Sequence, residues 1–76
     1  MNKARREKIQ RIISDLADIK ERISSVREEE EEAFDNMPEN LQDSLRGSTS
    51  QDAIDSLESA EESLDEALES LEEATY

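Results

Sequence analysis

Carboxylates are the main chemical groups of this chain, which has 22 Asp and Glu residues, nine Lys and Arg residues, and no His or Cys. The usual general base, thiolate nucleophile and imidazole metal ligand are therefore missing. Paired carboxylates act as acid and base only where a sheltered pocket separates their pKa values. A phosphate-binding glycine loop is excluded because Gly47 is the single glycine. We expect no enzyme activity, no catalytic residues, no metal site and no cofactor.

The densest group of carboxylates lies in the middle of the chain. We define it as the acidic patch: Glu28, Glu29, Glu31, Glu32, Asp35, Glu39, Asp43, Asp52 and Asp55. Carboxylates four residues apart on a helix lie ~6 Å from each other, close to the spacing of phosphates along a nucleic-acid strand. The patch is suited to binding a protein with a basic surface, or to imitating DNA or RNA and so inhibiting a nucleic-acid-binding protein. A solvated face that keeps a small protein in solution is the third interpretation.

Charge is unevenly distributed along the chain. Residues 1–27 carry eight Lys and Arg and four acids, a net charge of +4, whereas residues 28–76 carry one Arg and 18 acids, a net charge of −17. The two segments are expected to attract each other. Direct nucleic-acid binding is not expected, because the total charge of −13 repels phosphates.

Apolar residues recur at alternating spacings of three and four, which predicts two helices that pack along their length. The first set is Ile9, Ile12, Leu16, Ile19, Ile23 and Val26, and the same phase continues through Glu30, Ala33 and Met37. The second set has leucine at one heptad position and alanine at the other: Leu57, Leu64 and Leu71 with Ala53, Ala60, Ala67 and Ala74. We expect the large residues of the first helix to pack on the alanines of the second.

Pro38 and Gly47 interrupt the pattern between the two sets. Pro38 suits the first turn of a short helix, and Gly47 is expected to end that helix in a left-handed C-cap. Ser48 and Gln51 stand at capping-box spacing before the second long helix. The prediction is an all-α chain with helices at 3–35 and 50–75 and a short helical turn at 38–45. It forms one domain, residues 1–76, folded as an antiparallel two-helix coiled-coil hairpin.

The expected register pairs residues whose numbers add up to about 83. It places Lys20 beside Glu61, and Glu30 in the seam opposite Ala53 with its carboxylate reaching solvent. Two helices alone bury little apolar surface. We therefore expect the candidate self-association flank, formed by Ile13, Ile54 and Leu68, to join two hairpins into a homodimeric four-helix bundle.

The sequence contains no apolar run near the ~18 residues that span a bilayer. The first residues, MNKARREKIQ, are basic and lack the apolar stretch of a signal peptide. A cytoplasmic protein without membrane contact is the expectation.

Two resemblances add to these expectations. The segments MNKARREKIQRII and EEEEEAFDNMPENLQDSLRG, followed by a Glu/Leu/Ala-rich helix, resemble short acidic helical-hairpin proteins associated with bacteria, phages and mobile elements. This resemblance implies a genomic setting and no particular mechanism. The segment DNMPENLQDS is similar to the acidic hairpin tip of transcript-cleavage factors of the Gre type, which enters RNA polymerase. That similarity implies tip carboxylates at Asp35, Glu39 and Asp43.

Overall fold

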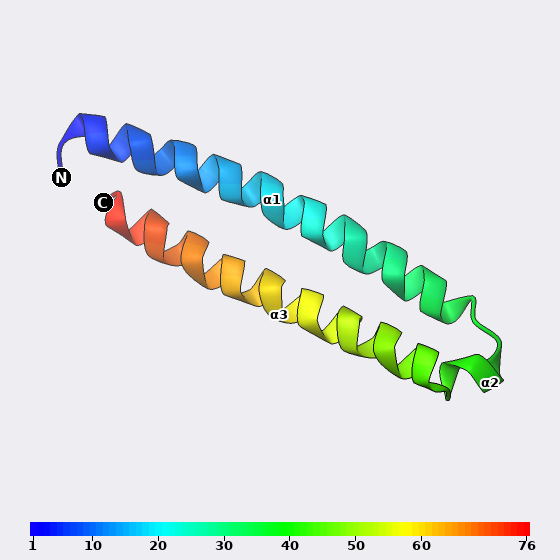
Figure 1. The fold of residues 1–76 in the computed structure, drawn as a ribbon. Coiled ribbons are helices and arrows are strands. Elements are labelled where there is room, and N and C mark those ends of the chain that lie inside the picture. Colours follow the sequence, from blue (N-terminus) through cyan, green and yellow to red (C-terminus); the bar gives the residue numbers. More distant parts are fainter.

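The computed structural model covers residues 1–76 and consists of three helices: α1 (Lys3–Asp35), α2 (Glu39–Gln42) and α3 (Leu45–Ala74). The two long helices lie side by side and antiparallel, with both termini at one end of the rod and α2 at the other (Figure 1). The rod measures 58 × 15 × 12 Å. The predicted all-α helical hairpin is therefore confirmed. No helix is both long and apolar enough to cross a membrane.

Helix α1 begins and ends where the sequence predicts. The Asn2 side chain caps the first turn by accepting a hydrogen bond from the backbone N–H of Arg5 at 2.9 Å. The helix ends at Asp35 because Pro38 disfavours helical backbone at the residue before it. Gln42 Nε2 donates from the turn to the carbonyl oxygen of Phe34 in the last turn of α1 and to that of Met37 just after the helix, both at 3.1 Å.

The predicted role of Gly47 is wrong. Gly47 does not have positive φ and does not end a helix; it is a buried residue in the first turn of α3. Helix α2 has only four residues, and α3 begins at Leu45 instead of residue 50, with Ser44 in the N-cap position. A Cβ built on Gly47 would lie 2.0 Å from the carbonyl oxygen of Gln42. The residue at this position must be glycine because the end of α2 lies directly against α3.

The interface between α1 and α3 keeps one predicted column on each helix and replaces the other. The α1 residues that are partly buried are Ile9, Ile13, Leu16, Lys20, Ile23, Ser24, Arg27, Glu30, Glu31 and Phe34. In α3, the residues that are buried or partly buried are Gly47, Ser50, Ile54, Leu57, Ala60, Glu61, Leu64, Leu68 and Leu71. Both helices are thus rotated by about one column from the expected seam. Ile54 is the one apolar side chain that is almost fully buried, with 4% exposed.

The rotation leaves the other predicted columns in solvent. Ile12, Ile19 and Val26 are 47%, 41% and 52% exposed, and Ala53, Ala67 and Ala74 are also exposed. One predicted column of each helix does lie in the interface as expected. These are the columns of Ile9, Leu16 and Ile23 in α1 and of Leu57, Leu64 and Leu71 in α3. The prediction that large residues of α1 cover the alanines of α3 is therefore wrong for Ala53, Ala67 and Ala74, whereas Ala60 is partly buried.

The register of the hairpin is close to the predicted one. Lys20 pairs with Asp65, and the Ser24 hydroxyl donates to Glu61 at 3.1 Å, so both pairs of residue numbers add up to 85. The expected sum was about 83. Lys20 consequently reaches one helical turn beyond Glu61, its expected neighbour.

Candidate functional site

The structure brings the acidic patch to the turn end of the rod from all three helices. Glu28, Glu29, Glu31, Glu32 and Asp35 lie in the last turns of α1, while Glu39 and Asp43 lie in and after α2 (Figure 1). Asp52 and Asp55 lie in the second and third turns of α3. All of these side chains are exposed except Glu31, which is partly buried. The members of the acidic patch are therefore gathered around one end of the rod in space as well as in sequence.

The turn end carries most of the negative charge of the protein. Residues 28–58 contain 11 acids and one cation, Arg46, a net charge of −10. The other end of the rod combines the +4 of residues 1–27 with the −7 of residues 59–76, a net charge of −3. Within the acidic patch, only Glu31 makes an ion pair, with Nη1 of Arg27 at 3.0 Å. The patch therefore presents eight carboxylates that no cation of the chain neutralises by direct contact.

Arg27 marks the boundary between the acidic patch and the rest of the rod. Its Nε donates to Glu61 Oε1 at 2.5 Å, and the Ser24 hydroxyl donates to the other oxygen of the same carboxylate at 3.1 Å. The Arg27 and Glu61 side chains are 21% and 14% exposed. The hydrogen bond from Arg27 lowers the pKa of Glu61 below its ordinary value, and the same bond raises the pKa of Arg27. These contacts connect α1 to α3 at mid-length.

Sequence reasoning did not single out this cluster. Lys20 and Arg27 are seven residues apart, in one heptad column with Ile13 and Phe34, and Glu61 occupies the column of Ile54 and Leu68. The signal was therefore present as two columns in which apolar residues alternate with opposite charges. Such columns are not recognised as part of a helix interface when only apolar residues are counted.

Glu30 differs from its neighbours in the run of five glutamates. It lies in the interface as predicted, but its partner is Ser50 and not Ala53. The Ser50 hydroxyl, in a residue that is 4% exposed, donates to Glu30 Oε1 at 2.6 Å. Glu30 is partly buried, lines an open groove near the turn and bonds to α3, so it contributes to the packing of the turn end.

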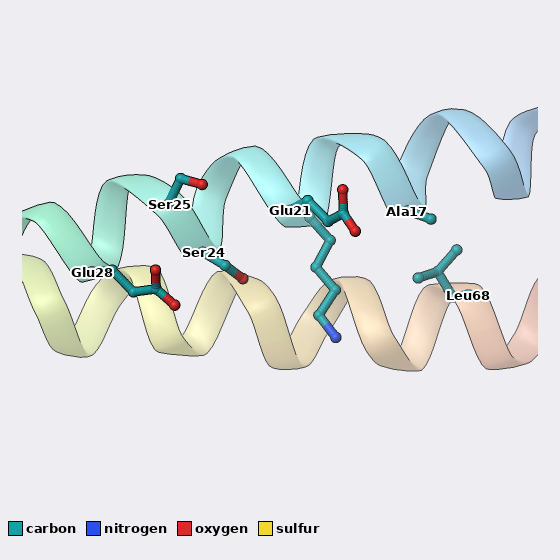
Figure 2. A pocket seen from close by; sticks show the side chains of 7 residues that line it. Ala17, Glu21, Ser24, Ser25, Glu28 and Leu68 are labelled. Atoms are coloured by element: carbon teal, nitrogen blue, oxygen red, sulfur yellow. The ribbon is translucent and has the colours of Figure 1, made fainter.

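The candidate self-association flank is largely used inside the hairpin. Ile54 is 4% exposed, and Ile13 and Leu68 are both partly buried. On this side an open groove runs along the two helices, and Leu68 points toward Ala17 across it (Figure 2). Glu21, Ser24, Ser25 and Glu28 of α1 also line the groove. Little apolar surface is left here for a second hairpin.

The other broad side of the hairpin is apolar. A groove there is lined by Ile19, Arg22, Ile23 and Val26 of α1 and Leu57 of α3. Toward the turn, Ala33 and Ala53 line a second groove together with polar residues that include Glu30 and Arg46. Residues seven apart on a helix lie in one column. We define the apolar face as the two outer columns of this side: Ile12, Ile19, Val26 and Ala33 on α1, and Ala53, Ala60, Ala67 and Ala74 on α3.

Comparison of the chain with protein-family models, with curated proteins and with solved structures gave no match. No group of three or more acidic side chains is arranged to hold a metal ion.

Proposed function

We propose that this protein is a non-enzymatic interaction protein whose acidic patch binds a basic surface of a protein partner. The observation that supports this most is the separation of charge, with −10 gathered at the turn end and −3 at the other. A cationic partner would approach one end of the rod and not its sides. Electrostatic attraction of this kind raises the association rate and makes binding sensitive to salt.

The experiment compares two charge-neutralised variants of equal size. The first changes Glu28, Glu32 and Asp55 of the acidic patch to Gln, Gln and Asn; all three are exposed and none makes an ion pair. The control changes three exposed acids of the other end to Gln: Glu62, Glu66 and Glu69. A partner is identified by affinity purification and its binding is then measured with purified proteins. We expect the first variant to lose binding and the control to keep it, whereas equal effects of both variants would contradict the proposal.

A second candidate is a polyanion mimic of phage type that inhibits a nucleic-acid-binding or defence protein. Glu28, Glu32 and Asp35 favour it because they are exposed and spaced by four and three residues along one side of α1. This spacing of ~6 Å is close to that of backbone phosphates. A mimic must compete with DNA or RNA for its partner, so binding that is insensitive to added nucleic acid would contradict this candidate.

A third candidate, an acidic hairpin tip of the Gre type that acts on RNA polymerase, can be distinguished from the first two by mutation. Asp35, Glu39 and Asp43 lie at the extreme turn end, beside α2. If these carboxylates enter a channel of RNA polymerase, neutralising them would abolish activity on transcription complexes while the Glu28, Glu32 and Asp55 variant stays active. The opposite order would favour the acidic patch as a docking surface.

We also propose that two hairpins associate into a four-helix bundle in the cytoplasm. The support is that a single apolar side chain is almost fully buried, while three large ones of α1 are at least 41% exposed. A small domain with so little buried apolar surface gains stability by oligomerisation. Sedimentation equilibrium at micromolar concentration tests this proposal: we expect twice the chain mass of 8.7 kDa, and a monomer would contradict it.

A further inference from the structure

The apolar face has two unlike halves. Its α1 column contains Ile12, Ile19 and Val26, which are large and between 41% and 52% exposed. Its α3 column is all alanine, and the column beyond it consists of Thr49, Ser56, Ser63 and Ser70. The one charged residue of these two α3 columns is Arg46, in the first turn of α3, and every position from residue 49 onward is uncharged. A partner on this face therefore meets large side chains on α1 and, from residue 49 onward, a smooth, uncharged surface on α3.

The column that borders the large residues of α1 carries alternating charges. Lys8, Asp15, Arg22 and Glu29 follow one another at intervals of seven residues, and all four are exposed. None of them makes an ion pair within the chain. In an antiparallel pair of helices, residues of such a column meet those of the same column on the other helix. The order of the four charges therefore determines which arrangement of a partner helix gives attractive pairs on this face.

We infer that the occupant of the apolar face is a second copy of this chain, packed antiparallel to the first about a two-fold axis through Ile19. This inference rests on the proposed self-association and specifies its face and direction. With the axis there, Lys8 of one copy meets Glu29 of the second, and Asp15 meets Arg22. Each pair occurs twice, as a two-fold axis requires, and all four contacts are attractive.

The apolar residues fit the same axis. Ile19 packs on Ile19 of the second copy, and Ile12 packs on Val26. One column further inside, Leu16 packs on Ile23 of the second copy. The axis also passes through the middle of α1, since Lys3–Asp35 is centred on residue 19. The two α1 helices therefore overlap along their whole length.

The two α3 helices fit this axis as well. The Lys20–Asp65 contact places residue 19 of α1 level with residue 66 of α3, next to Ala67. The axis therefore crosses α3 at Ala67, which meets Ala67 of the second copy. Ala60 then meets Ala74, and Ser63 meets Ser70. Alanine and serine at all of these positions let two acidic helices approach closely with no charge in the contact.

The opposite direction of packing is less favourable. If the copies were parallel, α1 of one would lie over α3 of the other, and the four charges would face Thr and Ser. The two turn ends, each with a net charge of −10, would also lie together. In the antiparallel arrangement each acidic end lies beside the basic N-terminal residues of the other copy, and Glu28 and Glu32 stay outside the contact.

The size of the face suits a stable dimer. The two larger dimensions of the rod are 58 and 15 Å, and their product is about 870 Å². A standard protein interface buries about 800 Å² on each partner. About the axis at Ile19 and Ala67, all of α1 but only residues 60–74 of α3 overlap with the second copy, so the contact is somewhat smaller than this side of the hairpin.

The first test measures the dimer dissociation constant of Ile19→Asp by sedimentation. Ser14→Asp is the control, because it adds the same charge at an exposed position outside the apolar face. We expect Ile19→Asp to weaken dimerisation by at least about 100-fold and the control to change it little. Circular dichroism at a concentration where both are monomers verifies that the hairpin is folded. A wild-type monomer would overturn both the self-association and the face, whereas a dimer that tolerates Ile19→Asp would overturn the face alone.

The second test measures the direction of packing. The chain has no cysteine, so Asn40→Cys places one spin label on each copy, at the exposed turn end. The antiparallel dimer separates the two labels by at least about 48 Å, twice the ~24 Å rise from residue 19 to Asp35. A parallel dimer brings them within about 20–30 Å, the width of two or three helices, and that result would overturn the inference.

The third test reverses charges. Arg22→Asp places two like-charged pairs in the dimer and is expected to raise the dissociation constant about tenfold. Combining Asp15→Arg with Arg22→Asp restores both pairs with reversed signs and should recover wild-type affinity. If the double variant dimerises no better than the single one, the assigned pairing is wrong.

Discussion

Replacing Gly47 by alanine tests the most specific feature of the turn. Glycine inside a helix normally costs stability, and replacing it with alanine gains about 1 kcal/mol. Gly47 has ordinary helical backbone, so alanine at this position would stabilise α3 if the helix stood alone. We nevertheless expect Gly47→Ala to destabilise the hairpin.

The reason is the distance between α2 and α3. The new Cβ would lie 2.0 Å from the carbonyl oxygen of Gln42 and 2.6 Å from that of Leu41, whereas ordinary contact begins at 3.4 Å. The end of α2 would have to move by about 1.4 Å, the difference between 3.4 and 2.0 Å. That movement also disturbs the two hydrogen bonds of the Gln42 side chain to the end of α1. Overpacking of this kind costs about 1–3 kcal/mol, which exceeds the gain in helix propensity.

The assay is thermal and urea unfolding followed by circular dichroism. A net loss of about 1 kcal/mol lowers the melting temperature of a domain this size by about 4–8 °C. Hydrogen exchange should be faster at the amides of residues 41–44, which bond within the turn. Ser48→Ala, at the next and exposed position, is the control and should be neutral or slightly stabilising. A Gly47→Ala protein as stable as the wild type, or more stable, would refute the close packing of α2 on α3.

Two further predictions concern polar contacts between the long helices. Glu61→Gln should be less stable than wild type near pH 7, and the difference should disappear as the pH falls below 4.5, the ordinary pKa of this group. The folded state lowers the pKa of Glu61, so the ionised carboxylate stabilises the fold, and this stabilisation is lost as the pH falls through the lowered pKa. Urea unfolding at several pH values measures the difference in unfolding free energy between the two proteins. A difference that does not change with pH would argue against the contact with Arg27. Ser50→Ala should cost about 1 kcal/mol by removing the bond to Glu30, and the double change with Glu30→Met should recover most of that loss. The unfolding free energies of the two single variants and the double variant measure this coupling. If the losses of the single variants simply add in the double variant, Ser50 and Glu30 are not coupled.

Local signals in the sequence were sufficient for the boundaries of α1 and for the antiparallel direction of the hairpin. Asn2 and Pro38 determine where α1 begins and ends through contacts within a few residues of each terminus. The opposite charges of residues 1–27 and 59–76 and the short connection favoured antiparallel packing. The acidic patch was also predictable as a group, because its members are close in sequence or lie on both sides of a short turn.

The role of Gly47 was not predictable in this way. The same residue can end a helix with positive φ or allow another backbone to approach closely. Only the position of α2 against the first turn of α3 distinguishes the two, and that position depends on contacts between separate elements.

The choice of interface columns was also decided by the tertiary structure. The heptad pattern by itself determined that α1 has apolar residues in three neighbouring columns, those of Ile9, Ile12 and Ile13. It could not determine which of them face α3, since the column with Lys20 and Arg27 is unfavourable until acids lie opposite. The register brings Glu61 and Asp65 to these cations, so their charges are paired at the interface. The sequence alone thus established two long helices and an acidic end. The pairing of charges between α1 and α3 in the tertiary structure decided which side of the rod remained apolar and open.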